Sequence, residues 1–317
     1  MLLKPPYMKK FDIIVAGDCN IDLIFNQFNK LPNYGEEVLA EQFELTLGSS
    51  AGITAVHLSA LGAKVAYVGA VGKDAFGIQF KSILESKGVD TSFMVEKPDH
   101  KTGCTVVMSK DEDRANLTHA GAMAHLQPTD IPESLLQKSD FFHLSNPYVL
   151  PHFRNTLPQF FKYLKLEGLL TSLDPQWDVE EKWNTDLKSM LPHLDIFLPN
   201  KEELHNLLKG NSLSFDELLS YSANAIINTM GSNGVQLLQN GKNTHFESYL
   251  NAHPVDCIGA GDAFSAGLLA GLIKGHSIKE AIDMGCKNGA LSTTVAGGAV
   301  AYSTPTEFEQ MFKESFR

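Results

Sequence analysis

The sequence predicts an α/β fold in which a doubly wound, mostly parallel central sheet is covered by helices on both faces. Short apolar runs rich in β-branched residues alternate along the chain with stretches in which apolar residues recur every three or four positions. This alternation is typical of βαβ units. Two other regions alternate between polar and apolar residues, which indicates strands with one face in water and therefore a second, small sheet.

The strands of the central sheet are expected in six apolar runs. In chain order these are FDIIVAG (11–17), KVAYVGAVG (64–72), DFFHLS (140–145), LLTSLDP (169–175), DIFLPN (195–200) and AIINTMG (225–231). Helical spacing is clear in AGITAVHLSALGA (51–63) and FGIQFKSILESKG (76–88). Inserts at about 21–47 and 92–119 are expected to supply the small sheet as a lid. We expect residues 1–317 to form a single domain of this kind, with the lid inserted into it.

Composition excludes several classes of partner. The chain is 43% hydrophobic and 20% charged, with a formal net charge of -11. An acidic protein of this kind is not expected to bind nucleic acid or an anionic membrane. The four cysteines, Cys19, Cys104, Cys257 and Cys286, lack metal-ligand spacing and are interpreted as reduced thiols. No signal peptide or membrane-spanning run is recognised, so a cytoplasmic location is expected.

The stretch VDCIGAGDAFSAGLLAGL at 255–272 carries the most informative motif. Gly259 and Gly261 leave backbone N–H groups bare where a helix is predicted to begin, and these groups with the helix dipole form a site for an anion. Asp262 would repel that anion unless it has another task, such as accepting a proton from a hydroxyl group that attacks a phosphoryl group. An aspartate also favours the first turn of any helix, so these residues alone leave both interpretations open.

The motif DCIGAGDAFSAG resembles the C-terminal signature of the ribokinase/PfkB carbohydrate-kinase family, which usually reads D-T-x-G-A-G-D-x-F. Further segments resemble elements of that family in the same order along most of the chain, among them GDCNID, LPNYGEEV, LGSSAGITAVHLSALGAKVAYVGAVGKDAFG, LDPQW, LPNKEEL, NTMGSNGV and GGAVAYSTP. The resemblance implies a ribokinase-like fold. It also implies transfer of the γ-phosphate of ATP, with Mg²⁺, to a hydroxyl group of a sugar-like substrate.

The resemblance further implies the roles of individual residues. Asp262 would be the general base, and the anion hole would consist of Gly259, Ala260 and Gly261. Residues that would contact the substrate are Asn20, Asp22, Gly48, Ser49 and Arg114. Residues that would contact the nucleotide are Asn200, Glu203, Thr229, Gly231 and Asn288. Glu203 would also help to order Mg²⁺, while Asp256 and carbonyl groups near 296–301 would hold a monovalent cation such as K⁺.

The sequence departs from the family pattern at three of these places. Cys257 stands where threonine is usual, which weakens the expectation of a cation site. Ser49 replaces the second glycine of a Gly-Gly pair, and Ile53 stands where an asparagine is frequent. A polar contact to the sugar has thus become apolar, so the identity of the substrate stays open. Asn200 and Glu203 also match a helix capping box, a role compatible with magnesium binding.

Three functions other than a carbohydrate kinase can be compared with these residues. GSSAG at 48–52 matches the nucleophile elbow of a serine hydrolase, with Ser50 as nucleophile and an Asp and a His such as His253 downstream. The preceding segment alternates in polarity, however, whereas an elbow strand in a parallel sheet should be apolar throughout. A non-catalytic sugar or nucleotide sensor has no need of Asp262. A nucleoside kinase of the same superfamily differs only in its substrate pocket and remains the nearest alternative. Exposed strand edges in the lid favour a homodimer.

Overall fold

The structure, a computed structural model, describes residues 9–110, 113–221, 225–298 and 300–316. Its centre is an eight-stranded sheet with the order β14-β13-β12-β11-β10-β9-β1-β4. The strands are β1 (Ile13–Ala16), β4 (Val65–Val68), β9 (Phe141–Ser145), β10 (Leu170–Asp174), β11 (Ile196–Phe197), β12 (Ala225–Thr229), β13 (Val235–Gln239) and β14 (Lys242–Phe246). The six strands β4, β1, β9, β10, β11 and β12, neighbours in this order, run parallel. At the edge next to β12, the strands β13 and β14 continue the sheet in antiparallel pairing.

Each of the six predicted runs contains a strand of this sheet, so the prediction of a mostly parallel α/β fold is confirmed. The β13–β14 hairpin was not predicted. Its second strand, KNTHF, is mostly exposed and carries no apolar alternation that sequence analysis could detect. Pairing with β13, rather than its own hydrophobicity, makes this segment a strand.

The helices alternate with these strands. They are α1 (Ser50–Ala60), α2 (Ala75–Ser86), α3 (Glu133–Leu136), α4 (Pro151–Arg154), α5 (Leu157–Leu166), α6 (Leu187–Met190), α7 (Lys201–Gly210), α8 (Phe215–Tyr221), α9 (Ala260–Ile273), α10 (Ile278–Ser292) and α11 (Pro305–Ser315). Shorter 3₁₀ turns lie at Gly121–His125, Pro128–Asp130, Pro147–Val149, Leu191–His193 and Gly231–Asn233. Among the described residues no helix combines the length and apolar character needed to cross a membrane. The four cysteines are all described, and none forms a disulfide.

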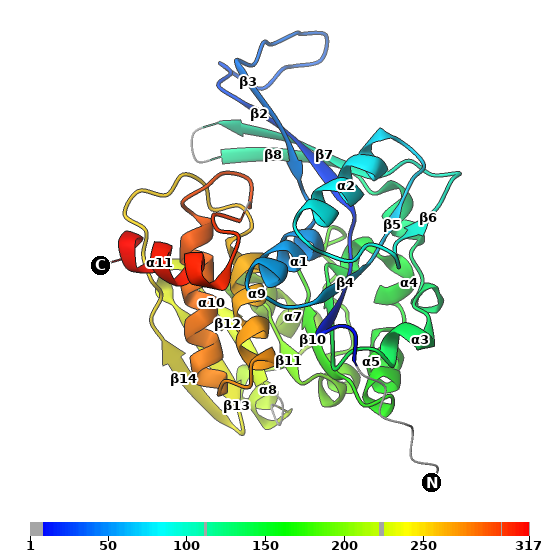
Figure 1. Cartoon of the computed structure of the whole chain (residues 1–317), viewed down its shortest axis with the longest axis vertical. Coiled ribbons are helices and arrows are strands. Elements are labelled where there is room, and N and C mark those ends of the chain that lie inside the picture. The colour runs from blue at the N-terminus through cyan, green and yellow to red at the C-terminus, as the bar shows by residue number, and fades with distance from the viewer. Residues whose placement is uncertain (1–8, 111–112, 222–224, 299, 317) are drawn as a thin grey trace.

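Helix α9, which carries Asp262 in its first turn, is built of small and apolar residues because it packs closely against two other helices. Its residues from Asp262 to Gly271 are buried against α1 and α10 (Figure 1). A Cβ atom on Gly267 would lie 2.7 Å from the carbonyl oxygen of Met284 and 2.9 Å from the Cα of Gly285. The small residues therefore allow two helices to pack closely, and this packing holds the start of α9 in a fixed place.

A separate four-stranded sheet projects from the central body (Figure 1). Its order is β3-β2-β7-β8, formed by β2 (Asn20–Asn26), β3 (Gln42–Leu47), β7 (Gly103–Lys110) and β8 (Asp113–His119). The prediction of a small separate sheet is confirmed. The segment near residue 95 differs from expectation: β6 (Val95–Glu96) does not join the small sheet but pairs in parallel with β5 (Ala70–Val71), which directly follows β4 in the chain.

Candidate active site

A cavity of about 470 Å³ lies between the small sheet and the carboxyl ends of the central strands. The small sheet contributes Asp22 and Asn116, and the helix α9 contributes its first turn. Other lining residues come from the ends of strands and the starts of helices: Gly48, Ser50, Ile53, Asp174, Gln176, Leu198, Asn200, Glu203, Thr229, Cys257, Ile258 and Ser265. The carboxyl ends of parallel strands are the usual ligand-binding edge of an open α/β sheet.

Asp262 lies in the first turn of α9 and lines this cavity while its side chain is largely buried. Gln176 donates a hydrogen bond from Nε2 to Asp262 Oδ1 at 2.9 Å. Burial raises the pKa of Asp262 well above its usual value, and the charges of Asp174, Asp18 and Glu203 raise it further. A carboxylate with a raised pKa is a stronger proton acceptor, as a general base requires.

The turn before Asp262 has the conformation that its glycines indicate. Gly259 is the N-cap of α9 with φ 73°, in the left-handed region that favours glycine. The Ala260 N–H donates to the Cys257 carbonyl at 3.3 Å. The N–H groups of Gly261 and Asp262 lie in the first helical turn, where the helix supplies no carbonyl partner. These two groups are donors that an anion can meet, and Gly261 is one of the three residues predicted for the anion hole.

Two further carboxylates face the cavity beside Asp262. Asp174 ends β10 and accepts a hydrogen bond from Ser265 Oγ at 3.2 Å, and Glu203 lies in the first turn of α7. Burial raises the pKa of Asp174 to about 7, and burial together with the charge of Asp174 raises the pKa of Glu203 to about 8. Since buried carboxylates at close quarters repel one another, this arrangement favours a bound cation.

Asn200 and Glu203 form the predicted capping box at the start of α7. Asn200 Oδ1 accepts from the Glu203 N–H at 2.9 Å, and Glu203 Oε2 accepts from the Asn200 N–H at 2.9 Å. Both side chains nevertheless line the cavity. Among the described residues no group of three or more His, Cys, Asp or Glu side chains has metal-binding geometry. Mg²⁺ commonly uses only one or two carboxylates and takes its other ligands from phosphates and water, so the donors present suit it.

Gln176 is a cavity residue that sequence reasoning missed. Its Nε2 donates to Asp174 Oδ1 at 3.1 Å as well as to Asp262 Oδ1, so one amide group links two carboxylates that lie far apart in sequence. Its backbone has φ 56°, a conformation that a glutamine rarely adopts. The segment LDPQW gave no local signal for this role, because the contact exists only when β10 and α9 come together.

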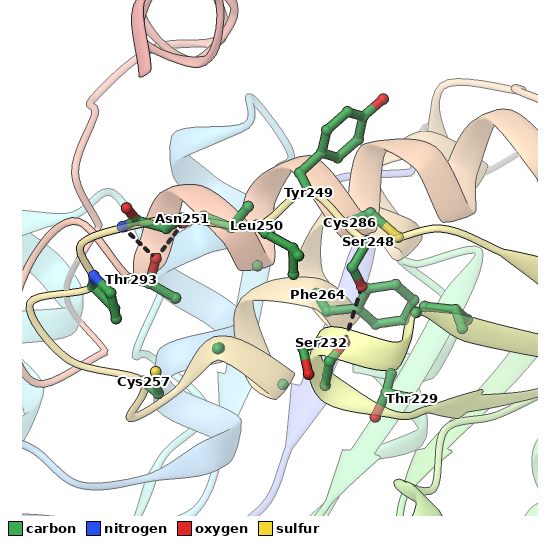
Figure 2. Close-up of a pocket in the computed structure, with 18 residues that line it drawn as sticks. Thr229, Ser232, Ser248, Tyr249, Leu250, Asn251, Cys257, Phe264, Cys286 and Thr293 are labelled. Carbon is green, nitrogen blue, oxygen red and sulfur yellow. Dashed lines mark hydrogen bonds between the residues drawn. The ribbon is translucent and has the colours of Figure 1, made fainter. Parts of the chain in front are cut away.

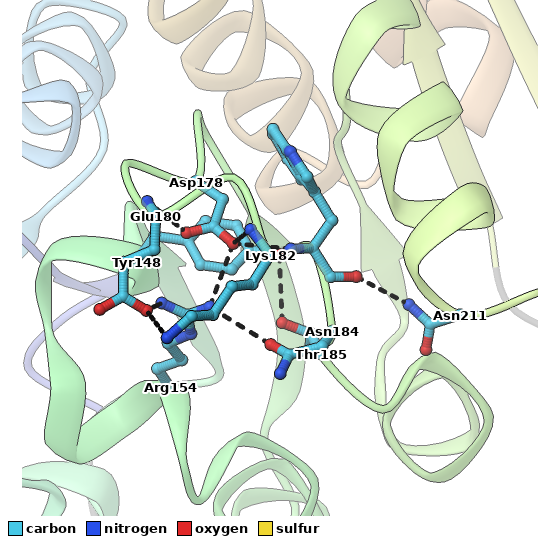
Figure 3. A network of polar contacts seen from close by, with 9 residues as sticks. Tyr148, Arg154, Asp178, Glu180, Lys182, Asn184, Thr185 and Asn211 are labelled. Carbon is cyan, nitrogen blue, oxygen red and sulfur yellow. Dashed lines mark hydrogen bonds and ion pairs between the residues drawn. The ribbon is translucent and has the colours of Figure 1, made fainter.

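The loop that carries Gln176 is anchored by a buried network (Figure 3). Asp178 is fully buried and accepts hydrogen bonds from three backbone N–H groups, those of Glu180, Lys182 and Trp183. It also pairs with Arg154 Nη2 at 3.1 Å, while Arg154 Nη1 pairs with Glu180 at 2.7 Å. Charge-assisted bonds of this kind hold the loop after β10 and so support the strained backbone of Gln176.

The predicted substrate residues Asn20, Asp22 and Gly48 lie together. Asn20 Nδ2 donates to Asp22 Oδ1 at 3.0 Å and to Thr105 Oγ1 at 3.1 Å. A Cβ atom on Gly48 would lie only 1.9 Å from Asp22 Oδ1, so only glycine leaves room for this carboxylate. Burial raises the pKa of Asp22 to about 6, and the charge of Asp18 adds to the effect. Ile53 lines the same cavity as an apolar neighbour.

A second cavity of about 400 Å³ adjoins the first and shares Thr229, Cys257, Ala260 and Gly261 with it. Figure 2 shows Phe264, Cys286 and the segment from Ser248 to Asn251 among the residues that line it. Gly231, predicted near the phosphates, also lines this cavity. The shared residues form the junction between the two cavities, so the Gly259–Asp262 turn has one cavity on each side.

A family model for the pfkB family of carbohydrate kinases matches residues 10–305. The chain belongs to this family. It is 27% identical over 302 residues to a ribokinase from Bacillus subtilis (strain 168), a match that covers 95% of this chain and 99% of that protein. In structure it resembles an E. coli protein assigned as ribokinase II and solved with ATP and Mg²⁺ (TM-score 0.82, 20% identity, 96% and 99% covered). It also resembles a Burkholderia thailandensis nucleoside kinase solved with inosine (TM-score 0.80, 19% identity, 96% and 97% covered).

The fold is therefore the ribokinase fold, and the chain is a carbohydrate kinase. Family membership also weighs against the hydrolase interpretation. In this kinase, Ser50 begins α1, and the strand before it, β3, belongs to the small sheet and not to the central parallel sheet that a nucleophile elbow requires. His253 is exposed and is not one of the residues that line the cavity.

Two predicted site residues of this pfkB-family kinase point away from both cavities. Ser49 is the N-cap of α1: its Oγ accepts from the Gly52 N–H at 2.8 Å and donates to the Asp18 carbonyl at 2.6 Å, so Ser50 lines the cavity instead.

Asn288 is fully buried on the side of α10 that faces α9 and donates to the Ala263 carbonyl at 2.7 Å. Its neighbours Gly289 and Ala290 line the second cavity.

The structure describes the remaining predicted residues only in part. Asp256 accepts hydrogen bonds from the N–H groups of Ile258 at 2.9 Å and Gly297 at 3.0 Å, so it joins the loop before α9 to the loop after α10. Arg114 belongs to β8, where it pairs with Ser109, and its side chain lies outside the described part of the structure. Ala299, within the carbonyl segment 296–301, also lies outside the described residues.

The raised pKa values predict how the stability of the ligand-free kinase depends on pH. In the folded state Asp174 and Glu203 keep their protons up to about pH 7 and 8, whereas ordinary values are 3.8 and 4.5. The stability that the protonated pair contributes is therefore complete below about pH 4 and is lost progressively from there until the pH has risen through 7 to 8. We expect the melting temperature to fall over this range, and to fall less steeply in Glu203→Gln, measured by differential scanning fluorimetry. Equal slopes for the two proteins would contradict the assignment.

Proposed function

We propose that this protein transfers the γ-phosphate of ATP to a hydroxyl group of a sugar-like substrate, with Asp262 as the general base. The observation that carries the proposal is the place of Asp262, a buried carboxylate of raised pKa beside the bare N–H groups of a helix start. A base and an anion site at one point suit the removal of a proton from a hydroxyl group while a phosphoryl group is held for attack.

The two cavities divide the reactants between them. The adenine group of ATP fits the second cavity, whose walls include Phe264, Leu250 and Ala290, and the phosphates reach the N–H groups of Gly261 and Asp262 at the junction. Thr229 and Gly231 lie beside that path. Glu203 and Asp174, with Asn200, would hold Mg²⁺, which when bound neutralises charge on the phosphates.

The sugar fits the first cavity under the small sheet, between Asp22 and Asp262. Asp22 accepts hydrogen bonds from hydroxyl groups, and the Gly48 backbone approaches closely because no side chain intervenes. We propose that the small sheet acts as a lid, since closing it over the sugar would exclude the water that competes as phosphoryl acceptor. Arg114 of β8 would contribute a substrate contact from this lid.

A nucleoside kinase is the second candidate. The apolar Ile53, which lines the same cavity as Gly48, favours it, because an apolar wall suits a less hydroxylated part of the acceptor than a free sugar presents. The similarity to a nucleoside kinase fold is consistent with both candidates. The identity of the acceptor is thus the point that an assay must decide.

The proposed kinase would be tested by Mg²⁺-ATP turnover against free sugars, sugar phosphates, sugar acids and nucleosides. Turnover with one class of acceptor supports the function and names that class. Esterase activity that depends on Ser50, without phosphoryl transfer, would instead support a hydrolase. Binding of ATP without turnover on any acceptor would point to a sensor. K⁺ in place of Na⁺ at constant ionic strength tests the proposed monovalent cation at Asp256, and we expect K⁺ to raise the rate.

The outer face of the small sheet suggests that the protein forms homodimers. The register places Leu23, Phe25, Phe43, Leu45, Val106, Met108, Ala115 and Leu117 on the face opposite Asp22. Phe43 and Leu117 are 56% and 70% exposed. Contiguous apolar surface of this kind is usually covered by a partner, and we propose a second copy of the chain.

We expect Leu117→Glu to convert the dimer to a monomer, because a charge at a buried apolar contact carries a desolvation cost that pairing does not offset. Size-exclusion chromatography with light scattering measures the mass directly. Leu166→Glu is the matched control, since Leu166 is 77% exposed at the end of α5 and far from the small sheet in sequence. A wild-type protein that is monomeric at all concentrations would rule out the proposed dimer.

A further inference from the structure

The back of the Gly259–Asp262 turn rests on a loop from near the end of the chain. A Cβ atom on Gly259 would lie 2.8 Å from the Gly298 Cα, and one on Gly298 would lie 2.8 Å from Ile53 Cδ1. Protein interiors are close-packed, so a shift of one such group forces a shift of the next. The position of Gly298 therefore helps to set the position of the turn.

A buried histidine holds Gly298 in place. His57 of α1 is fully buried, with Nε2 3.2 Å from the Gly298 carbonyl oxygen and Nδ1 3.3 Å from Asn288 Nδ2. A carbonyl oxygen can only accept and an amide N–H can only donate, so the ring has one donor and one acceptor nitrogen. Because an amide N–H donates to Nδ1, the proton is on Nε2 and is donated to the Gly298 carbonyl.

The orientation of the Asn288 amide is set in the same way. The Tyr302 hydroxyl donates to Asn288 Oδ1, which leaves the amide nitrogen facing His57 and α9. Asn288 Nδ2 also donates to the Ala263 carbonyl at 2.7 Å, and Ala263 directly follows Asp262. Each group thus donates to the next, from Tyr302 to Asn288, from Asn288 to His57, and from His57 to the Gly298 carbonyl. A branch from Asn288 reaches the first turn of α9.

We propose that His57, Asn288 and Tyr302 are positioning residues for phosphoryl transfer. They touch neither reactant. They hold Gly298 behind the anion site and Ala263 beside the base, so that the N–H groups of Gly261 and Asp262 keep their direction toward the transferred group. The inference rests on the proposed kinase function. A fully satisfied buried network fixes one geometry more strictly than apolar packing does, which is what a preorganised anion site requires.

The test compares variants of similar size. His57→Leu removes both hydrogen bonds of the ring, and Asn288→Asp keeps an acceptor for Tyr302 but loses the N–H donors to His57 and Ala263. His57→Gln retains one acceptor and one donor and serves as the rescue variant. His143→Leu is the matched control, because His143 is equally buried, bonds Ser172 Oγ at 2.9 Å in the central sheet, and lines neither cavity.

We expect kcat per folded molecule to fall about 10- to 100-fold in His57→Leu and Asn288→Asp, with KM for ATP and acceptor within about threefold, as for a misplaced catalytic group. His57→Gln should return kcat to within about threefold of the wild type. Amide hydrogen exchange in a peptide covering residues 255–264 should be faster in His57→Leu than in His143→Leu, because the turn loses its support.

Two results would overturn the inference: a kcat in His57→Leu equal to that of His143→Leu, or exchange in residues 255–264 that the substitution leaves unchanged. A wild-type protein without phosphoryl transfer to any acceptor contradicts the proposed function instead. The exchange measurement does not need turnover, so in that case it still decides whether the network positions the turn.

Discussion

Asp262→Asn is expected to lower kcat by roughly 10² to 10⁴, the range that a positioned general base contributes. The carboxamide has nearly the same shape and keeps an oxygen for the hydrogen bond from Gln176, but it cannot accept a proton. ATP binding should persist, because the N–H groups of the turn and the second cavity are unchanged. Steady-state kinetics with the preferred acceptor and calorimetric titration with nucleotide measure the two effects.

The stability of Asp262→Asn separates loss of the base from loss of the fold. Because burial and neighbouring carboxylates raise the pKa of Asp262, its charged form destabilises the folded state at neutral pH. Removing the charge should therefore raise the melting temperature at pH 8 while it lowers kcat. This is the usual trade between stability and activity at a catalytic site. A variant that is both fully active and more stable would show that Asp262 is not the base.

Gly259→Ala is expected to lower kcat by about 10² to 10³, comparable to the loss of one anion-hole donor. Its φ of 73° is strained for alanine, and the new Cβ would lie 2.8 Å from the Gly298 Cα. The turn must therefore move, and the N–H groups of Gly261 and Asp262 move with it. The left-handed conformation itself costs alanine about 1–2 kcal/mol of stability.

Gly241→Ala provides the control for backbone strain. Gly241 has φ 69° in the turn between β13 and β14, and a Cβ there would meet nothing within 4 Å. It should lose similar stability, measured by urea unfolding, and keep its full kcat. If Gly259→Ala also kept its kcat per folded molecule, within about threefold, the turn would not be an anion hole.

The features that sequence analysis predicted well have local causes. The six apolar runs became strands of the central sheet because each is hydrophobic enough to be buried on both faces. The left-handed Gly259 and the capping box of Asn200 and Glu203 follow from residues within one turn of each other. The polar β14 and the buried contacts of Asn288 have no such local cause, because both depend on segments that meet only in the folded chain.

The parallel α/β core, the small alternating sheet and the turn that begins α9 can be predicted from the amino-acid sequence, because they depend on periodicity and on backbone preferences over a few residues. The folded arrangement of the chain is what brings Asp22, Asp174, Glu203 and Asp262 into one cavity. It also lets Gln176 link two of them and turns Ser49 inward while Ser50 faces the cavity. Such contacts join residues far apart in the sequence, 86 positions for Gln176 and Asp262, and the raised pKa values that suit catalysis arise only when those residues are buried together.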